Sequence, residues 1–185
     1  KVNTSNLVDP DFGSYMETVI SAAERACREA FENREPFRVR IASGPQPPIG
    51  SERHTGESPG GSLFVLQFLT RSGRKLTVYN FACHPTVLNA GNLAVSADFV
   101  GGIQEQLDCH MAIFLNGAAG DISTRFTRKE SSFAECRRMG EKAARAISEA
   151  LEGKPFREPT ALKGSFERVV LQIRDVEPEE TVRPA

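Results

Sequence analysis

The sequence predicts a single layered domain of the α/β or α+β class, in which helices pack on a mixed β-sheet. Apolar positions change their period along the chain in the order helix, strand, hairpin, helix, strand, helix, strand. The 185 residues are enough to enclose one hydrophobic core. Polar clusters directly follow two of the predicted strands, and strand ends are where such folds place their sites.

Three segments have the apolar spacing of amphipathic helices. The first spans residues 12–32 and repeats apolar side chains at intervals of three and four. The second, residues 98–107, is short, and Asp98 is expected to be its N-cap. The third, residues 131–152, is long and ends at Gly153, a residue type that favours helix C-termini.

The predicted strands are alternating or continuously apolar. Residues 37–41 alternate, as a half-buried strand does. Residues 63–70 and 75–83 flank a short glycine turn and predict a β-hairpin. Residues 111–115 predict a buried strand, and residues 166–173 alternate as a last strand.

The remaining segments read as loops. Residues 44–62 are rich in Gly and Pro and predict a long loop, which places His54 at the surface. Loops of this length are usually functional or mobile. His110 opens a strand and is expected to pack or to cap. Residues 176–185 are acidic and contain proline, so a frayed tail is expected there.

Composition argues against several classes of protein. A net charge of -1 does not fit the clustered basic surface of a nucleic-acid-binding protein. No apolar run approaches the roughly 20 residues of a transmembrane helix. The polar residues 1–6 do not form a signal peptide, and the absence of an initiator Met predicts that earlier sequence exists.

The cysteines indicate neither a zinc ribbon nor a disulfide framework. They are Cys27, Cys83, Cys109 and Cys136, and no two form a Cys-x-x-Cys pair. We expect buried free thiols, because Cys27 and Cys136 lie on apolar helix faces and Cys83 follows an apolar strand. Free thiols favour a cytoplasmic location over secretion, although the compartment stays open.

His84 is the best candidate for a metal ligand. It follows a predicted strand and precedes Pro85, and proline restricts the residue before it to extended geometry. A fixed backbone suits a ligand, because zinc needs its ligands in place within a few tenths of an ångström. The alternative is a histidine that hydrogen-bonds a backbone carbonyl. Asp98 likewise has two interpretations, a helix cap or a carboxylate that supports a ligating histidine.

A second polar cluster, residues 116–125, follows the strand predicted at 111–115. Gly117 and Gly120 allow a tight turn whose amide groups can bind an anion. The side chains that follow offer a carboxylate, two hydroxyls and a guanidinium: Asp121, Ser123, Thr124 and Arg125. The alternative is a strand-to-helix loop that uses a Ser or Thr as a cap.

Three motifs, taken in order, resemble the central part of the catalytic domain of neutral/alkaline (non-lysosomal) ceramidase-like proteins. They are the runs NFACHPTVL (80–88), SADFVG (96–101) and FLNGAAGDIS (114–123). The resemblance covers roughly residues 8–152. It implies that residues 1–175 form part of a ceramidase-like catalytic domain.

This resemblance implies a zinc-dependent hydrolase of N-acyl amide bonds, with ceramide or a ceramide-like lipid as substrate. By the motif match, His84 corresponds to a zinc ligand. Ser123 and Arg125 correspond to active-site residues that contact the substrate or relay a proton. Asp98, Asn116 and Asp121 are expected to contact the substrate or to support the ligand.

The resemblance also implies parts that this sequence lacks. The family's first ligand lies in a Thr-His-Thr-His-Ser-Gly-Pro-type motif before its first helix, and a Glu and a Tyr ligand follow its last helix. No segment here matches them. We therefore expect His84 to be one ligand of about four. The isolated chain is expected to bind zinc weakly or not at all, and to be inactive without flanking sequence.

Two other functions remain open. One is a non-catalytic binding module of the same fold. The other is an unrelated serine-type hydrolase with Ser123 as nucleophile and His84 as base, although no Gly-x-Ser-x-Gly elbow is present. The polar loop 44–62 offers no apolar groove for ceramide, so a smaller N-acyl substrate fits the sequence as well.

Overall fold

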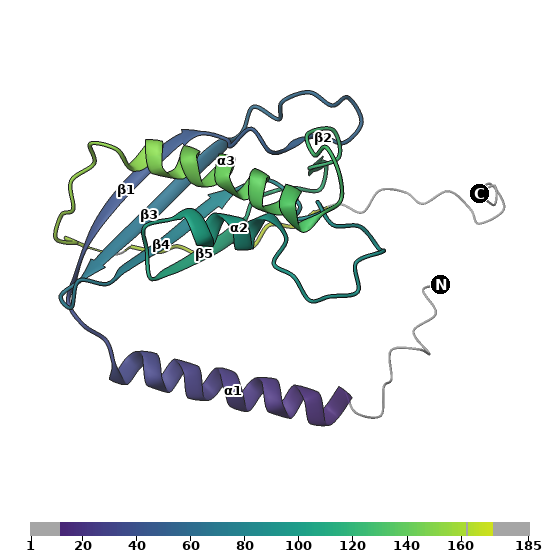
Figure 1. The fold of residues 1–185 in the computed structure, drawn as a ribbon. Helices are drawn as coiled ribbons and strands as arrows, with labels where there is room; N and C mark the ends of the chain where they lie inside the picture. Colours follow the sequence, from purple (N-terminus) through teal and green to yellow (C-terminus); the bar gives the residue numbers. More distant parts are fainter. Residues whose placement is uncertain (1–11, 162, 172–185) are drawn as a thin grey trace.

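A computed structural model describes residues 12–161 and 163–171. Within these ranges, a four-stranded mixed sheet and a two-stranded sheet combine with three helices, which confirms the predicted fold class (Figure 1). The strands are β1 (Phe37–Pro45), β2 (Ser51–Glu52), β3 (Ser62–Thr70), β4 (Lys75–Phe81), β5 (Met111–Asn116) and β6 (Ile122–Ser123). The helices are α1 (Phe12–Glu32), α2 (Phe99–Gln106) and α3 (Phe133–Leu151).

The larger sheet has the strand order β1-β3-β4-β5. The pairs β1–β3 and β3–β4 are antiparallel, and β3 and β4 form the predicted hairpin. β5 runs parallel to β4, and α2 lies in the connection between them. Because the two parallel strands end side by side, with Phe81 opposite Asn116, the segments that follow them start at the same edge of the sheet.

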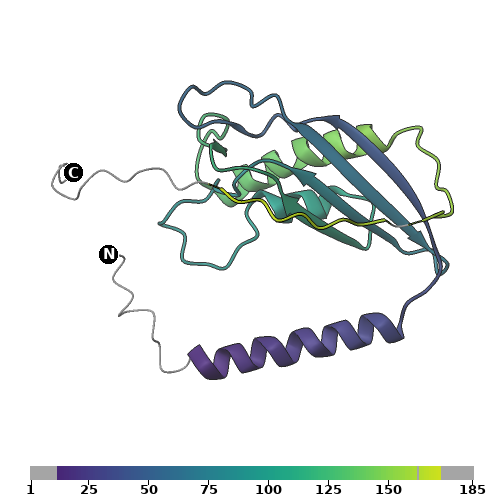
Figure 2. The ribbon, with the colours of Figure 1, turned by 180° about the vertical axis from the view of Figure 1, so that it is seen from behind.

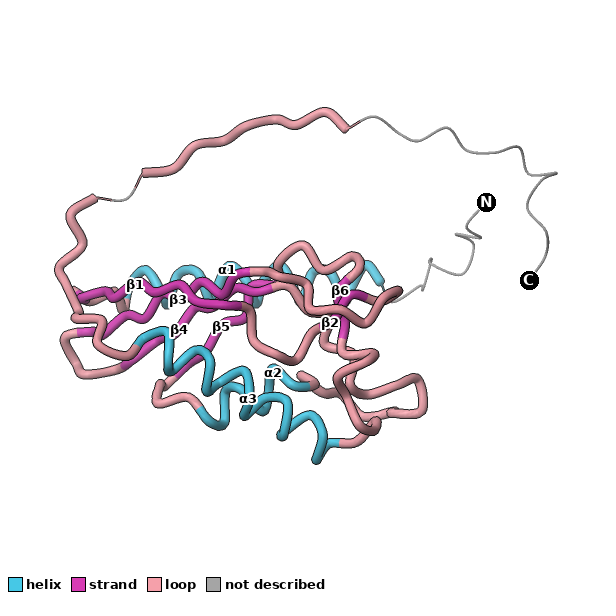
Figure 3. Tube along the Cα trace, turned by 90° about the horizontal axis from the view of Figure 1, so that it is seen from above, coloured by secondary structure: helices cyan, strands magenta, loops and turns pink. Residues whose placement is uncertain are grey.

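The core lies between one face of this sheet and the helices α2 and α3 (Figure 3). β3 alternates as a two-sided strand does, with Leu63 and Val65 buried and Phe64 exposed. Aromatic rings from three elements meet in the core, and the Phe81 and Phe114 centroids lie 4.9 Å apart. α3 contributes a stripe of buried side chains at helical spacing: Cys136, Met139, Ala143, Ile147 and Leu151.

Helix α1 has the predicted bounds but stands apart from the sheet (Figures 1 and 2). None of the residues 12–32 is buried. The prediction of a buried Cys27 is therefore wrong, since its amphipathic helix has no packing partner among the described residues and the thiol is exposed. Cys83 and Cys136 are buried as expected, Cys109 is half-buried, and all four are free thiols.

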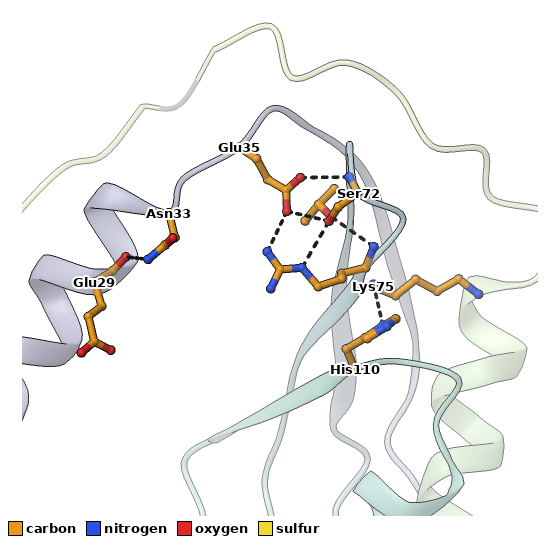
Figure 4. A network of polar contacts seen from close by, with 8 residues as sticks. Glu29, Asn33, Glu35, Ser72, Lys75 and His110 are labelled. Carbon is orange, nitrogen blue, oxygen red and sulfur yellow. Dashed lines mark hydrogen bonds and ion pairs between the residues drawn. The ribbon is translucent and has the colours of Figure 1, made fainter.

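Glu35 anchors the link between α1 and β1 to the turn of the β3–β4 hairpin (Figure 4). Its carboxylate accepts hydrogen bonds from the backbone N–H of Ser72 (2.9 Å), the Ser72 hydroxyl (2.8 Å) and the guanidinium of Arg74 (2.8 Å). The Arg74 guanidinium, helped by Ser72, lowers the pKa of Glu35 to about 2. Close by, the Nδ1 atom of His110 accepts from the backbone N–H of Lys75 at 3.2 Å, in agreement with the expected capping role.

Other expectations need correction. β5 is only partly buried, with Met111 and Leu115 exposed. It is an edge strand, and no element in the described part of the chain covers the sheet face opposite α2 and α3. Residues 166–171 are exposed and form no strand, since they pair with no neighbour; residues 172–173 and the tail 176–185 lie outside the described residues.

The predicted loop 44–62 is shorter than expected, because β1 extends to Pro45 and β2 interrupts the loop. His54 is exposed on it, as expected. No helix in the described part of the chain is both long enough and apolar enough to cross a bilayer.

Candidate functional site

The two polar clusters meet beyond the parallel ends of β4 and β5. His84 lies three positions after the end of β4, and Asn116 is the last residue of β5. The backbone N–H of His84 donates to the carbonyl of Ile122 at 3.1 Å, and His84 forms a parallel bridge with Ser123. Ser51 of β2 pairs with Ser123 from the other side. Backbone hydrogen bonding thus aligns three segments that are far apart in the sequence.

A pocket of about 380 Å³ lies on this arrangement. It is lined by Arg53, His84, Thr86, Ser123, Arg125 and Arg128. His84, Ser123 and Arg125 were predicted from the sequence, and the structure brings these three together in one cavity. His84 is half-buried and Ser123 is 5% exposed, whereas Arg125 is exposed.

Sequence analysis missed the other three lining residues. Arg53 reaches the site because the short strands β2 and β6 pair, and its backbone N–H donates to the carbonyl of Asp121 at 2.8 Å. The Arg128 guanidinium donates to the carbonyls of Thr86 and Val87, which ties the segment after β6 to the segment after His84. No local motif indicates these contacts, because each joins residues that are more than 40 positions apart.

Asp98 does not line the pocket but fixes the chain that follows His84. Its carboxylate accepts from the backbone N–H groups of Val87 (3.2 Å), Leu88 (2.9 Å) and Phe99 (2.8 Å). It is the N-cap of α2, as predicted. Among the described residues, no hydrogen bond joins Asp98 to the His84 ring. Asp98 therefore positions the His84 segment through the backbone.

The Asp98→Ala variant is expected to lower the free energy of unfolding by about 2 kcal/mol, because buried N–H groups lose their acceptor. Asp98 also has a φ of 54°, a conformation that Asn tolerates better than other non-glycine residues. Asp98→Asn should therefore cost less than Asp98→Ala in urea denaturation. Asp108→Ala, at an exposed carboxylate, is the control; an equal effect of all three variants would contradict this role.

Asn116 and Asp121 also lie outside the pocket lining. The Asn116 side-chain oxygen accepts from the backbone N–H of Cys83 at 3.3 Å, so it orients the residue next to His84. Gly117 lies so close to this segment that a Cβ atom there would come within 3.1 Å of the Ala82 nitrogen. Asp121 is exposed and contributes its backbone carbonyl, which accepts from Arg53.

Glu135 fixes the end of the segment that carries Arg125 and Arg128. It is buried in the first turn of α3, and its carboxylate accepts from the backbone N–H of Lys129 at 2.8 Å and from the guanidinium of Arg138. Its own N–H donates to the Ser132 N-cap at 3.1 Å. The Arg138 guanidinium, together with the Lys129 N–H, lowers the pKa of Glu135 from its ordinary value of 4.5 to about 2.

The pH dependence of Glu135→Gln follows from that depressed pKa. The charged carboxylate stabilises the fold fully above pH 4.5, and this contribution is lost as the pH falls toward 2. The variant should lower the free energy of unfolding by about 1–2 kcal/mol at pH 7, and the difference should shrink between pH 5 and pH 2. Glu141→Gln, on the exposed side of α3, is the control; a pH-independent difference would contradict the assignment.

The His84 imidazole is of a type that can serve as a metal ligand. The described residues contain no group of three His, Cys, Asp or Glu side chains that could hold a metal ion. Burial raises the pKa of the neighbouring Cys83 thiol to about 12, so this thiol is protonated at neutral pH when no metal ion is bound. A zinc site would therefore need ligands beyond this set.

The pocket thus offers one imidazole, two hydroxyls and three guanidinium groups from segments that backbone hydrogen bonds hold in register. These groups can bind a polar or anionic ligand and can donate hydrogen bonds to a carbonyl oxygen. Neither a protein-family model nor a curated protein sequence matches this chain.

Proposed function

We propose that this chain supplies part of the active site of a zinc-dependent hydrolase of N-acyl amide bonds, acting on ceramide, a ceramide-like lipid or a smaller N-acyl amide. The observation that supports this proposal is that His84, Ser123 and Arg125 line one pocket. Two of the three motifs that resemble the ceramidase-like family contribute His84 and Ser123, and Arg125 follows the second of these motifs by two positions. Their convergence is what a shared active site requires.

His84 has the role of a zinc ligand. Bound zinc supplies two effects to such a hydrolysis, since it lowers the pKa of a water molecule and polarises a carbonyl group. Arg125 donates to the amide carbonyl oxygen, where negative charge develops as water adds to the carbonyl carbon. Ser123 positions the substrate or passes a proton to the amine nitrogen. The C–N bond then breaks, and the products are a carboxylic acid and an amine.

Ligands from outside residues 1–185 complete the metal site in this proposal. One imidazole does not hold zinc tightly, since three or four protein ligands are the norm. The site therefore has to be tested in a longer protein that contains this chain together with its flanking sequence.

Removal of the metal tests the proposal. Hydrolysis of a fluorogenic N-acyl amide by the longer protein should fall to background after treatment with a chelator. One equivalent of zinc should restore it, and residues 1–185 alone should give no turnover. Full activity of the chelator-treated protein would refute the metal mechanism.

The serine-type alternative has less support from the geometry. The Ser123 hydroxyl oxygen accepts from the backbone N–H of Arg125 at 3.3 Å, and the side chain is almost fully buried. A nucleophilic serine needs a hydrogen bond to its base, and among the described residues none joins the Ser123 hydroxyl to the His84 ring. Covalent labelling of Ser123 by a fluorophosphonate would favour this alternative over the metal mechanism.

A further inference from the structure

The pocket that contains His84 carries a concentrated positive charge. Arg53, Arg125 and Arg128 all line it, and none of the described residues in its lining is acidic. Within the described part of the chain, none of these three arginines takes part in an ion pair. Three arginines therefore line one cavity without a carboxylate partner among the described residues, in a protein whose net charge is only -1.

Hydrogen bonds to backbone carbonyls hold two of these arginines beside His84 and Ser123, and an aromatic ring contacts the third. Arg128 donates to the Thr86 and Val87 carbonyls, and the Arg53 guanidinium donates to the Gly120 carbonyl at 3.5 Å. The guanidinium carbon of Arg125 lies 5.4 Å from the centre of the Phe126 ring. Guanidinium groups held in place in this way lose less conformational entropy when they bind a ligand than free arginines do.

The ligand that such a lining favours is an oxyanion. Guanidinium groups match carboxylate and phosphate oxygens with paired N–H donors, and their mutual repulsion falls when an anion lies between them. A neutral headgroup such as that of ceramide would leave this repulsion in place. A zinc ion at His84 would add positive charge, which strengthens the need for an anionic partner.

We propose that the pocket lined by Arg53, Arg125 and Arg128 binds an oxyanion, a carboxylate or a phosphate, carried by the amine part of an N-acyl amide substrate. The identity of this substrate rests on the proposed function, whereas anion binding does not. Arg53 and Arg128 are then specificity residues that hold the anion, while Arg125 faces both the anion and the scissile amide.

Anion binding can be measured on residues 1–185 without zinc or activity. Sodium phosphate and sodium acetate are titrated separately at constant ionic strength, with isothermal calorimetry and NMR shifts as readouts. Arg53→Gln and Arg125→Gln should each weaken binding by about tenfold, because each variant removes a positive charge and a charge-assisted hydrogen bond from the anion. The anion that binds more tightly identifies the preferred group.

Arg71→Gln is the matched control for this titration. Arg71 is an exposed arginine in the β3–β4 turn, at the opposite end of the sheet from the pocket, so its loss changes the net charge equally. It should leave binding unchanged. Equal affinities of the Arg53, Arg125 and Arg71 variants, or no binding of either anion, would overturn the proposal.

Substrate preference is measured on the zinc-loaded longer protein. An N-acylglycine and an N-acylethanolamine share the amide and the acyl chain and differ in one carboxylate. We expect kcat/KM to favour the N-acylglycine, or its phosphate-bearing counterpart if phosphate bound more tightly, by at least about tenfold. Arg53→Gln should abolish this preference.

Failure of the oxyanion site and failure of the proposed hydrolase function give different results. Hydrolysis of both amides at equal rates, without anion binding, would overturn the oxyanion site and leave the hydrolase proposal intact. Anion binding that depends on Arg53 and Arg125, without hydrolysis of either amide, would refute the hydrolase and retain the oxyanion site.

Discussion

The His84→Ala variant of the longer, zinc-loaded protein is expected to lose both its zinc and its amide hydrolysis. Bound zinc should fall from one equivalent to near zero, because a catalytic site has few protein ligands and the loss of one weakens all the others. Hydrolysis should fall on the order of a thousandfold, since the metal supplies several kcal/mol of transition-state stabilisation. Elemental analysis and steady-state kinetics on the same preparation measure both effects.

His54→Ala is the matched control for this variant. His54 is an exposed histidine in the loop between β2 and β3, and it does not line the pocket. Zinc content and hydrolysis should both be retained. The fold of His84→Ala should also be retained, because the bridge to Ser123 uses backbone atoms. Normal zinc content in His84→Ala would mean that His84 has only a structural role.

The Gly140→Ala variant is expected to lower the free energy of unfolding by about 3 kcal/mol, at the upper end of the range for overpacking. Gly140 lies where α3 crosses α2. A Cβ atom there would come within 2.5 Å of the carbonyl carbon of Gly102 and 2.7 Å of the nitrogen of Ile103. Both are backbone atoms, so the helices would have to move apart and open the core. Urea denaturation of the two proteins measures the difference.

Gly101→Ala is the control for the helix contact. Its added Cβ would meet the Ala97 side chain at 3.6 Å, an ordinary contact distance. In the helix α2, alanine is favoured over glycine, so stability should be unchanged or should rise by up to about 1 kcal/mol. Equal destabilisation by Gly101→Ala and Gly140→Ala would show that the close approach of α2 and α3 is not what makes Gly140 sensitive.

Periodicity predicted the elements well because most of them have one buried face. The bounds of α1 and of the β3–β4 hairpin agree closely with the structure. The alternation that predicted a last strand was wrong for residues 166–171, because a strand also requires a partner strand and periodicity does not reveal one. Similarly, the apolar stripe of α1 predicts an amphipathic helix but does not specify what it packs against.

Sequence reasoning predicted half of the pocket lining. His84 and Ser123 follow strands that are parallel neighbours, and such strand ends meet at one edge of a sheet. Arg53 was missed because its place depends on β2, a two-residue strand whose partner β6 lies 70 positions later. Arg128 was missed because its place depends on hydrogen bonds to the distant carbonyls of Thr86 and Val87. Pairings this short and this distant leave no pattern in the sequence.

The site assignments of Asp98 and Asn116 became positioning roles for a related reason. Asp98 lies in the motif at 96–101 and Asn116 in the motif at 114–123. Their side chains accept hydrogen bonds from backbone N–H groups and do not line the pocket. A sequence motif can contain both residues that take part in the chemistry and residues that only hold them in place. The two kinds of residue are distinguished by the hydrogen-bond partners that the structure shows.

Anomalous X-ray scattering at the zinc edge tests the central claim most directly. Crystals of the zinc-loaded longer protein should give an anomalous peak about 2.0–2.1 Å from an imidazole nitrogen of His84, the normal Zn–N distance. The peak should lie in the pocket that Ser123 and Arg125 line. A zinc peak elsewhere, or a His84 ring hydrogen-bonded to the protein with no peak beside it, would contradict the assignment of His84 as a ligand.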